Sequence, residues 1–139
     1  MSWVNNQSHT IRNRAMNILV NAFSVNMLNG DNQAVDFCPI TGAEAHSFLV
    51  DGFKSFIGHE STATLLSHQL GLDVEYNRQS YRFMPNDTVV LAQYTGPRLP
   101  DFAVQLPEGA SIRWWQIRIM RRLSIFNDGL KHYSIHQYR

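Results

Sequence analysis

The sequence predicts a single α+β domain in which helices flank one mixed β-sheet. The chain has 139 residues, 44% of them hydrophobic and 17% charged, which suffices for one core and is too short for two. Two adjacent central segments carry apolar residues at helical spacing, whereas the segments on either side are short and rich in β-branched and aromatic residues. Strands, then helices, then strands are typical of a sheet covered by helices.

The first strands are expected at the start of the domain. Residues 1–15 are polar and aperiodic, so we assign them to an N-terminal extension and begin the domain at Met16. The apolar run 17–23 predicts a strand, and a turn region separates it from a second strand expected over 33–40. Pro39 is expected to end that second strand.

Two helices are expected in the centre of the chain. Thr41 is a suitable N-cap for a helix whose apolar positions continue at helical spacing as far as Phe56. The second helix is expected to begin at Ser61 and to stop at Gly71, a residue suited to the left-handed position after a helix. His59 therefore lies immediately before a predicted helix N-terminus.

The second half of the domain is expected to be mostly strand. Three strands are predicted, over 80–84, 88–94 and 112–120. A proline-rich loop, 96–109, joins the last two of them. Residues 124–139 are weakly patterned and are assigned to a C-terminal tail, so the domain spans 16–123.

Composition excludes several classes of protein. The net charge is only +1, so we expect no long nucleic acid as partner, and a nucleotide ligand would have to be met by a few placed cations. Cys38 is the single cysteine, which excludes an internal disulfide and zinc sites of the CxxC kind. The sequence has neither a membrane-spanning apolar run nor a secretory h-region. We therefore expect a cytoplasmic protein that has no membrane partner and no cofactor.

His59 is the first candidate for chemistry. It follows a glycine and precedes a helix, a position at which free backbone N–H groups attract an anion. A histidine there can donate a proton near neutral pH. The alternative is a capping or loop histidine in contact with water. No histidine pairs with a second ligand at a metal-binding spacing such as HExxH, so we expect no metal site.

Arginines form the second group of candidates. Arg98 lies between Pro97 and Pro100, which restrict the loop, and its planar guanidinium suits a phosphate. On local sequence alone, a surface arginine in a turn is the favoured interpretation, and Arg78 is similar. The arginines within 113–122 lie beside two tryptophans and suggest nucleic-acid binding, but a solvated strand face explains them better.

Small polar residues cluster where the first strand ends, at Asn21, Ser24 and Asn26. By default such residues satisfy turn hydrogen bonds. Asn21 is unusual because it interrupts an apolar strand on the face expected to hold Leu19 and Phe23. A buried amide needs hydrogen-bond partners, which a bound adenine edge or phosphate could supply.

Five blocks of sequence occur in an order that resembles a known family. They are Asn21-Ala-Phe-Ser-Val-Asn-Met-Leu28, residues 55–67, 71–78 and 90–93, and Gly96-Pro-Arg-Leu-Pro100. The order resembles the viral ring-nuclease family, also called the type III anti-CRISPR family, over about residues 16–120. The first block and the run Ile57-Gly58-His59-x-x-Thr62 are the most specific parts of the resemblance.

The resemblance implies a homodimer that encloses cyclic tetra-adenylate at the subunit interface and cuts it without metal. A ribose 2′-hydroxyl would attack the adjacent phosphorus and leave a 2′,3′-cyclic phosphate. His59 matches the family histidine that protonates the departing 5′-oxygen, and Arg98 matches the arginine that stabilises charge on the phosphate. The expected substrate contacts are Asn21, Ser24, Asn26, Gly58, Arg78 and Gln93.

The loop after Arg98 departs from the family pattern. Many relatives run Arg-Leu-Pro-Glu-Gly, whereas here Asp101 and Phe102 follow the first proline and Glu108-Gly109 come seven residues later. The family acid therefore maps to Asp101 by spacing or to Glu108 by local motif, and we prefer Asp101. The altered loop leaves open a second function, a sponge that sequesters a cyclic nucleotide without cutting it, and it leaves the ring size open.

Overall fold

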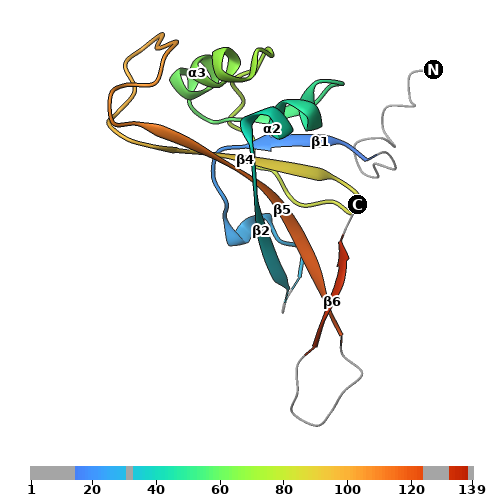
Figure 1. Ribbon diagram of the computed structural model, residues 1–139. Coiled ribbons are helices and arrows are strands. Elements are labelled where there is room, and N and C mark those ends of the chain that lie inside the picture. The colour runs from blue at the N-terminus through green and yellow to red at the C-terminus, as the bar shows by residue number, and fades with distance from the viewer. Residues whose placement is uncertain (1–14, 31–32, 124–131, 138–139) are drawn as a thin grey trace, which may run out of the picture.

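The computed structural model describes residues 15–30, 33–123 and 132–137. Within them the elements in chain order are β1 (Asn17–Val20), η1 (Val25–Met27), β2 (Ala34–Ile40), α2 (Gly42–Leu49), β3 (Lys54–Phe56), α3 (Glu60–Leu70), β4 (Thr88–Thr95), β5 (Ser111–Leu123) and β6 (His132–Gln137). They form a single α+β domain, so the predicted fold class is confirmed (Figure 1). The described residues begin at 15 and omit 124–131, so most of the predicted extension and part of the predicted tail lie outside them.

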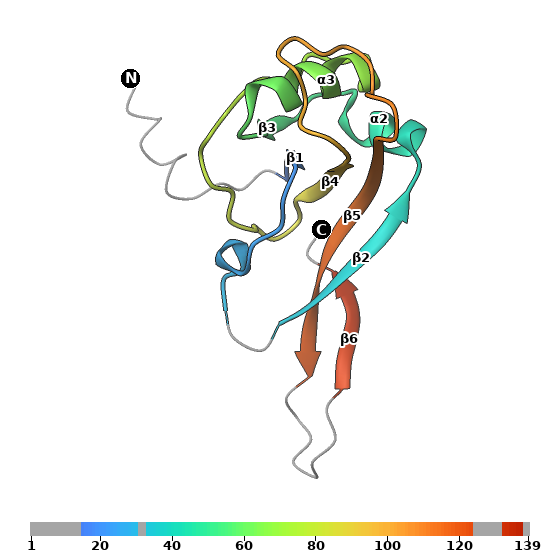
Figure 2. The same cartoon turned by 90° about the vertical axis from the view of Figure 1, so that its left-hand side faces the viewer.

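The six-stranded sheet is mixed. Its order is β2-β5-β4-β1-β3, and β6 pairs with β5 off this path. Strand β1 runs parallel to both β3 and β4, whereas β5 is antiparallel to β2, β4 and β6. The carboxyl ends of β4, β1 and β3 therefore lie at one edge of the sheet, called here the carboxyl edge. It is on the left of Figure 1 and faces the viewer in Figure 2.

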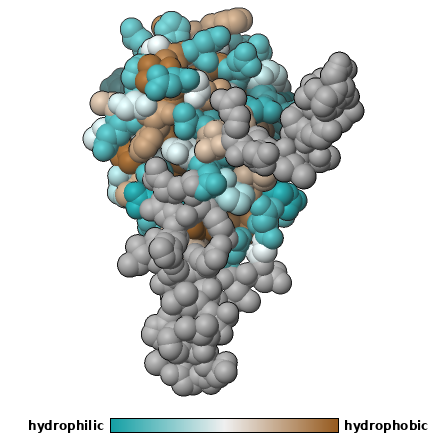
Figure 3. Space-filling view, turned by 90° about the vertical axis from the view of Figure 1, so that its right-hand side faces the viewer, coloured by the Kyte–Doolittle hydropathy of each residue, from teal (hydrophilic) through white to brown (hydrophobic). Residues whose placement is uncertain are grey.

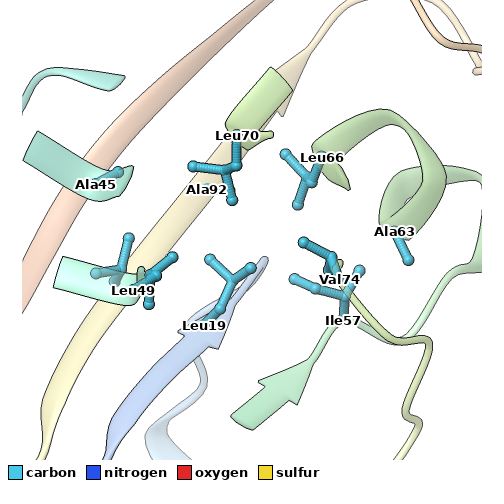
Figure 4. Close-up of a cluster of buried hydrophobic side chains, with 10 residues drawn as sticks. Leu19, Ala45, Leu49, Ile57, Ala63, Leu66, Leu70, Val74 and Ala92 are labelled. Atoms are coloured by element: carbon cyan, nitrogen blue, oxygen red, sulfur yellow. The ribbon is translucent and has the colours of Figure 1, made fainter. Parts of the chain in front are cut away.

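The sheet is buried on both faces, and β4 alternates between them. Val90 and Ala92 belong to the core under the two helices, whereas Val89 and Leu91 belong to the core on the other face. In Figure 4, side chains from α2, α3, β1 and β4 converge under the helices. This helix-side core comprises Leu19, Ala45, Leu49, Ile57, Ala63, Leu66, Leu70, Val74, Val90 and Ala92.

The opposite face is covered by η1 and by the segment that precedes β4. The Phe83 N–H donates to the Met27 carbonyl at 2.8 Å, which ties that segment to η1. The buried Tyr81 hydroxyl donates to the Asp87 carboxylate at 2.6 Å. Tyr81 and Phe83 pack inward against Ile18 and its neighbours, so these two aromatic residues help to cover this face of the sheet.

Local signals located the start of α2 and the end of α3. The Thr41 hydroxyl accepts from the Glu44 N–H, and the Glu44 carboxylate accepts from the Thr41 N–H, so Thr41 is the N-cap of α2. Gly71 has a φ of 69° and ends α3, as expected. The prediction that the first helix continues to Phe56 is wrong. α2 ends at Leu49, Gly52 turns the chain at a φ of 123°, and Lys54–Phe56 pairs with β1 instead.

Two strand predictions also need correction. Residues 80–84 form no strand, because their alternating aromatic residues pack on a face of the sheet and do not pair at its edge. The first strand ends at Val20, not at residue 23. Asn21 and Phe23 therefore leave the face of Leu19, and Phe23 packs with the opposite core. Residues 132–137, within the weakly patterned tail, form strand β6.

The helices of the described residues, 8 and 11 residues long, are both too short to cross a membrane. From the side opposite the carboxyl edge, polar residues are interspersed with smaller apolar areas over the described upper part of the molecule (Figure 3). The candidate residues lie toward the other side, so the carboxyl edge is where a site has to be sought.

Candidate functional site

The turn after β1 brings the first polar candidates to the carboxyl edge. Asn21 follows β1 directly and is half-buried, and its side chain makes no hydrogen bond within the described part of the chain. Ser24 has the ordinary turn role, because its hydroxyl accepts from the Asn26 N–H at 3.2 Å and caps η1. Ser24 and Asn26 are exposed beside this cap. The side chains of Asn21 and Asn26 thus both have hydrogen-bonding capacity that the described residues do not use.

The end of β3 places His59 at the N-terminus of α3. His59 is the N-cap, with φ −127° and ψ 128°, and its exposed side chain makes no capping hydrogen bond to the described first turn of α3. The first-turn N–H groups are therefore available to an anion. A Cβ added at Gly58 would meet no described atom within 4 Å, so the backbone before His59 is open to close approach.

A segment far along the chain, which leads to Arg78, pairs with the backbone just before Gly58 and His59. Tyr76 bridges Ile57 in parallel, and the Asn77 N–H donates to the Ile57 carbonyl at 2.9 Å. The Asn77 side-chain amide also donates to the Ser55 carbonyl at 2.8 Å. Because the two segments run in the same direction, the exposed Arg78 follows Asn77 where Gly58 and His59 follow Ile57. A guanidinium and an imidazole thus project from adjoining backbone segments.

A cavity of about 280 Å³ lies below this segment, but its chemistry does not suit a phosphate. Its lining includes Lys54 and two acidic residues, Asp73 and Glu75. Carboxylates repel an anion. This cavity is therefore a poor place for an anion, and the candidate residues on the carboxyl edge lie outside its lining.

Gln93 lies near the end of β4 and is held by a residue that the sequence did not single out. The Trp115 indole N–H donates to the Gln93 amide oxygen at 3.0 Å. An indole N–H only donates, so this contact assigns the oxygen and leaves the Gln93 NH₂ group free to donate elsewhere. The Arg113 guanidinium lies 4.3 Å from the centroid of the Trp115 ring. Cross-strand register makes this arrangement, so no local signal could have found it.

The loop that carries Arg98 is closed at its base. A Cβ at Gly96, whose φ is 153°, would come within 2.6 Å of the Ala110 Cβ. The Tyr94 hydroxyl donates to the Pro97 carbonyl at 2.5 Å. Arg98 follows directly and is exposed. Figures 1 and 2 both place this loop beside α3, the helix whose N-cap is His59.

The two candidate acids occupy the same place in two similar turns. In the first turn the Ala103 N–H donates to the Pro100 carbonyl at 3.3 Å, and in the second the Ala110 N–H donates to the Pro107 carbonyl at 3.0 Å. The acids, Asp101 and Glu108, are the second residue of each turn, and both are exposed. The third residue has a positive φ in each case: 63° at Phe102 and 82° at Gly109. This is the arrangement of a type II turn, which favours glycine at the third position.

The remaining polar candidates are accounted for by structure. His46 donates through Nδ1 to the Leu70 carbonyl at 2.8 Å, and His68 is exposed near the far end of α3. Arg118 lies 3.8 Å from the Asp36 carboxylate and donates to Gln116. Among the described residues, no cluster of three or more His, Cys, Asp or Glu side chains could hold a metal ion.

The chain is similar to proteins of known sequence and structure. A family model described as STIV B116-like matches residues 17–111. B116 of Sulfolobus turreted icosahedral virus is similar in structure, with a TM-score of 0.62 and 21% identity over 74% of this chain and 98% of that one, a likeness that shows the fold alone. A stretch of 32 residues, 23% of this chain, is 53% identical to the uncharacterized protein YddF of Bacillus subtilis strain 168 and spans 30% of that protein's length.

Proposed function

We propose a function for this chain, which belongs to the STIV B116-like family. It binds a cyclic oligoadenylate and cleaves it without metal, and it thereby counters type III CRISPR signalling. Cyclic tetra-adenylate is the expected ligand, as the resemblance to viral ring nucleases implies. The observation that carries the proposal is that an imidazole, a guanidinium and an oriented amide, from His59, Arg78 and Gln93, lie at the ends of neighbouring parallel segments. Ligands of open α/β sheets bind at such an edge.

The chemistry of the proposed reaction matches these groups. Attack of a ribose 2′-hydroxyl on the adjacent phosphorus forms the 2′,3′-cyclic phosphate and breaks the bond to the 5′-oxygen. Negative charge grows on the non-bridging oxygens, where the Arg98 guanidinium and the N–H groups of α3 would stabilise it. The departing 5′-alkoxide needs a proton, and His59 is the exposed acid at that helix end.

A homodimer is part of the proposal. A ring of four phosphates has two-fold symmetry, and a dimer with an isologous interface would offer each group twice. Arg78 and Arg98, doubled, would provide four positive charges for four phosphates. This meets the requirement set by a chain whose net charge is only +1.

The direct test is incubation of purified protein with cyclic tetra-adenylate in EDTA, followed by chromatography and mass spectrometry. Linear products ending in 2′,3′-cyclic phosphate are expected. His59→Ala should slow cleavage by about 10²- to 10⁴-fold, the usual contribution of a general acid, while ligand binding persists. His68→Ala is the matched control, because that exposed histidine lies on the same helix, away from its N-terminus. Its rate should equal the wild-type rate.

Cleavage by His59→Ala at the wild-type rate would show that the assigned mechanism is wrong. Sedimentation of the ligand-free protein as a monomer that also binds one ring per chain would refute the symmetric site.

A second candidate function is sequestration without cleavage. The loop with Asp101 and Phe102 favours it, since the acid has a shorter side chain than glutamate and the next residue is bulky. Intact ring recovered after long incubation, with tight binding, would support the sponge. Rapid appearance of linear dinucleotides would exclude it.

A further inference from the structure

Phe102 stands where the geometry of its turn calls for glycine. Pro100-Asp101-Phe102-Ala103 and Pro107-Glu108-Gly109-Ala110 have the same pattern, the same closing hydrogen bond and a positive φ at the third residue. The left-handed conformation costs a residue with a Cβ about 5- to 30-fold in the folding equilibrium constant. Gly109 avoids this cost and Phe102 does not.

Nothing in the described chain offsets that cost by burying the ring. Phe102 is 83% exposed, the largest exposed fraction among the described large hydrophobic residues. The loop is nevertheless well supported, because its base closes at Gly96 and Ala110 and the Tyr94 hydroxyl holds the Pro97 carbonyl. The aromatic ring is therefore exposed on a loop whose base is fixed, and its backbone conformation lowers the stability of the fold. Such strain persists where it serves function.

We infer that Phe102 is a stacking contact for a nucleobase of the ligand, a role that rests on the proposed function of the carboxyl edge. The ring lies four residues after Arg98 and directly after Asp101. A loop that carries both a guanidinium and an exposed aromatic ring fits a nucleotide, whose phosphate needs a cation and whose base has a flat π-face. The charged neighbours argue against a second protein copy as the occupant, because the buried centre of a protein interface is depleted of charge.

The experiment measures affinity and stacking in a background that does not cleave. In His59→Ala protein, calorimetry with cyclic tetra-adenylate gives the Kd, and a ring carrying 2-aminopurine reports stacking through quenched fluorescence. Phe102→Gly should weaken binding by about 5- to 150-fold and abolish the quenching. Phe102→Gly should also stabilise the fold, because glycine adopts the positive φ of this position without strain, as Gly109 does in the second turn.

Three further variants separate stacking from bulk. Phe102→Tyr keeps a π-face, so its affinity and quenching should stay close to those of the His59→Ala parent. Phe102→Leu keeps the strain and the apolar bulk but should lose the quenching. Val104→Gly, at an aliphatic residue of the same loop that is 46% exposed, should leave both readouts unchanged.

The outcomes distinguish this inference from the proposed function. Tight ligand binding that Phe102→Gly leaves undiminished overturns the stacking role and keeps the proposed function. Weaker self-association of ligand-free Phe102→Gly, with unchanged ligand affinity, identifies a second copy as the occupant and overturns the inference. A parent protein that has no affinity for cyclic tetra-adenylate overturns both.

Discussion

Replacing His59 by asparagine should make the protein more stable and nearly inactive. His59 is the N-cap of an 11-residue helix and makes no capping hydrogen bond to its described first turn. Asparagine is among the best N-cap residues, and a good cap is worth about 1 kcal/mol relative to a residue that does not cap. The shift in melting temperature is this gain divided by the unfolding entropy, which is about 2.1 cal/mol/K per residue. For 139 residues the melting temperature therefore rises by about 3 °C.

The same substitution removes the proposed proton donor. Cleavage of cyclic tetra-adenylate should fall by about 10²- to 10⁴-fold, because an amide cannot protonate the 5′-alkoxide. Thermal unfolding by circular dichroism and product analysis by chromatography measure the two effects on one preparation. Stability and activity should therefore change in opposite directions.

The N-cap of α2 supplies the control. Thr41 completes a reciprocal pair of hydrogen bonds with Glu44, so Thr41→Ala should lower stability by about 1–2 kcal/mol and leave cleavage unchanged. A lower melting temperature for His59→Asn would contradict the capping argument. Wild-type cleavage by His59→Asn would contradict the catalytic one.

Three further substitutions test the parts of the site separately. The Cβ that Gly58→Ala adds meets no described atom within 4 Å, so the melting temperature should stay within about 1 °C of the wild-type value. Calorimetry should nevertheless show about tenfold weaker ligand binding, because the methyl group blocks close approach to the backbone. Gly96→Ala forces a Cβ to within 2.6 Å of the Ala110 Cβ, so urea titration should show a loss of about 1–3 kcal/mol and cleavage should slow as Arg98 moves. Trp115→Phe keeps an aromatic ring but releases Gln93, so KM should rise about 2- to 10-fold with kcat unchanged.

Elements with strong local signals were predictable from the sequence. The Thr41 cap and the Gly71 stop each follow from a few neighbouring residues, and both are found in the structure. β3 was missed because Phe56, and Phe53 just before the strand, also satisfy helical spacing, and only pairing with β1 decides between the two. Residues 80–84 alternate like a strand but satisfy that pattern by packing on a face of the sheet, a choice that depends on tertiary contacts.

The candidate site was predictable residue by residue but not as an arrangement. His59 has a local signal, its place before a helix. Its neighbour Arg78 arrives through the bridge between Ile57 and Tyr76, which no sequence spacing indicates. Gln93 depends on Trp115, 22 residues away, through a contact across two strands.

Departures from local rules concentrate at one edge of this molecule. α2 has a complete capping box, and the left-handed Asn86, in the turn before β4, is a residue type that tolerates that conformation. At the carboxyl edge, by contrast, a helix begins at an uncapped histidine, and on the loop that follows β4 a phenylalanine occupies a glycine position. Sequences that fold well satisfy local preferences except where function opposes them. The loss of stability at His59 and Phe102 therefore supports the proposal that a ligand binds at this edge.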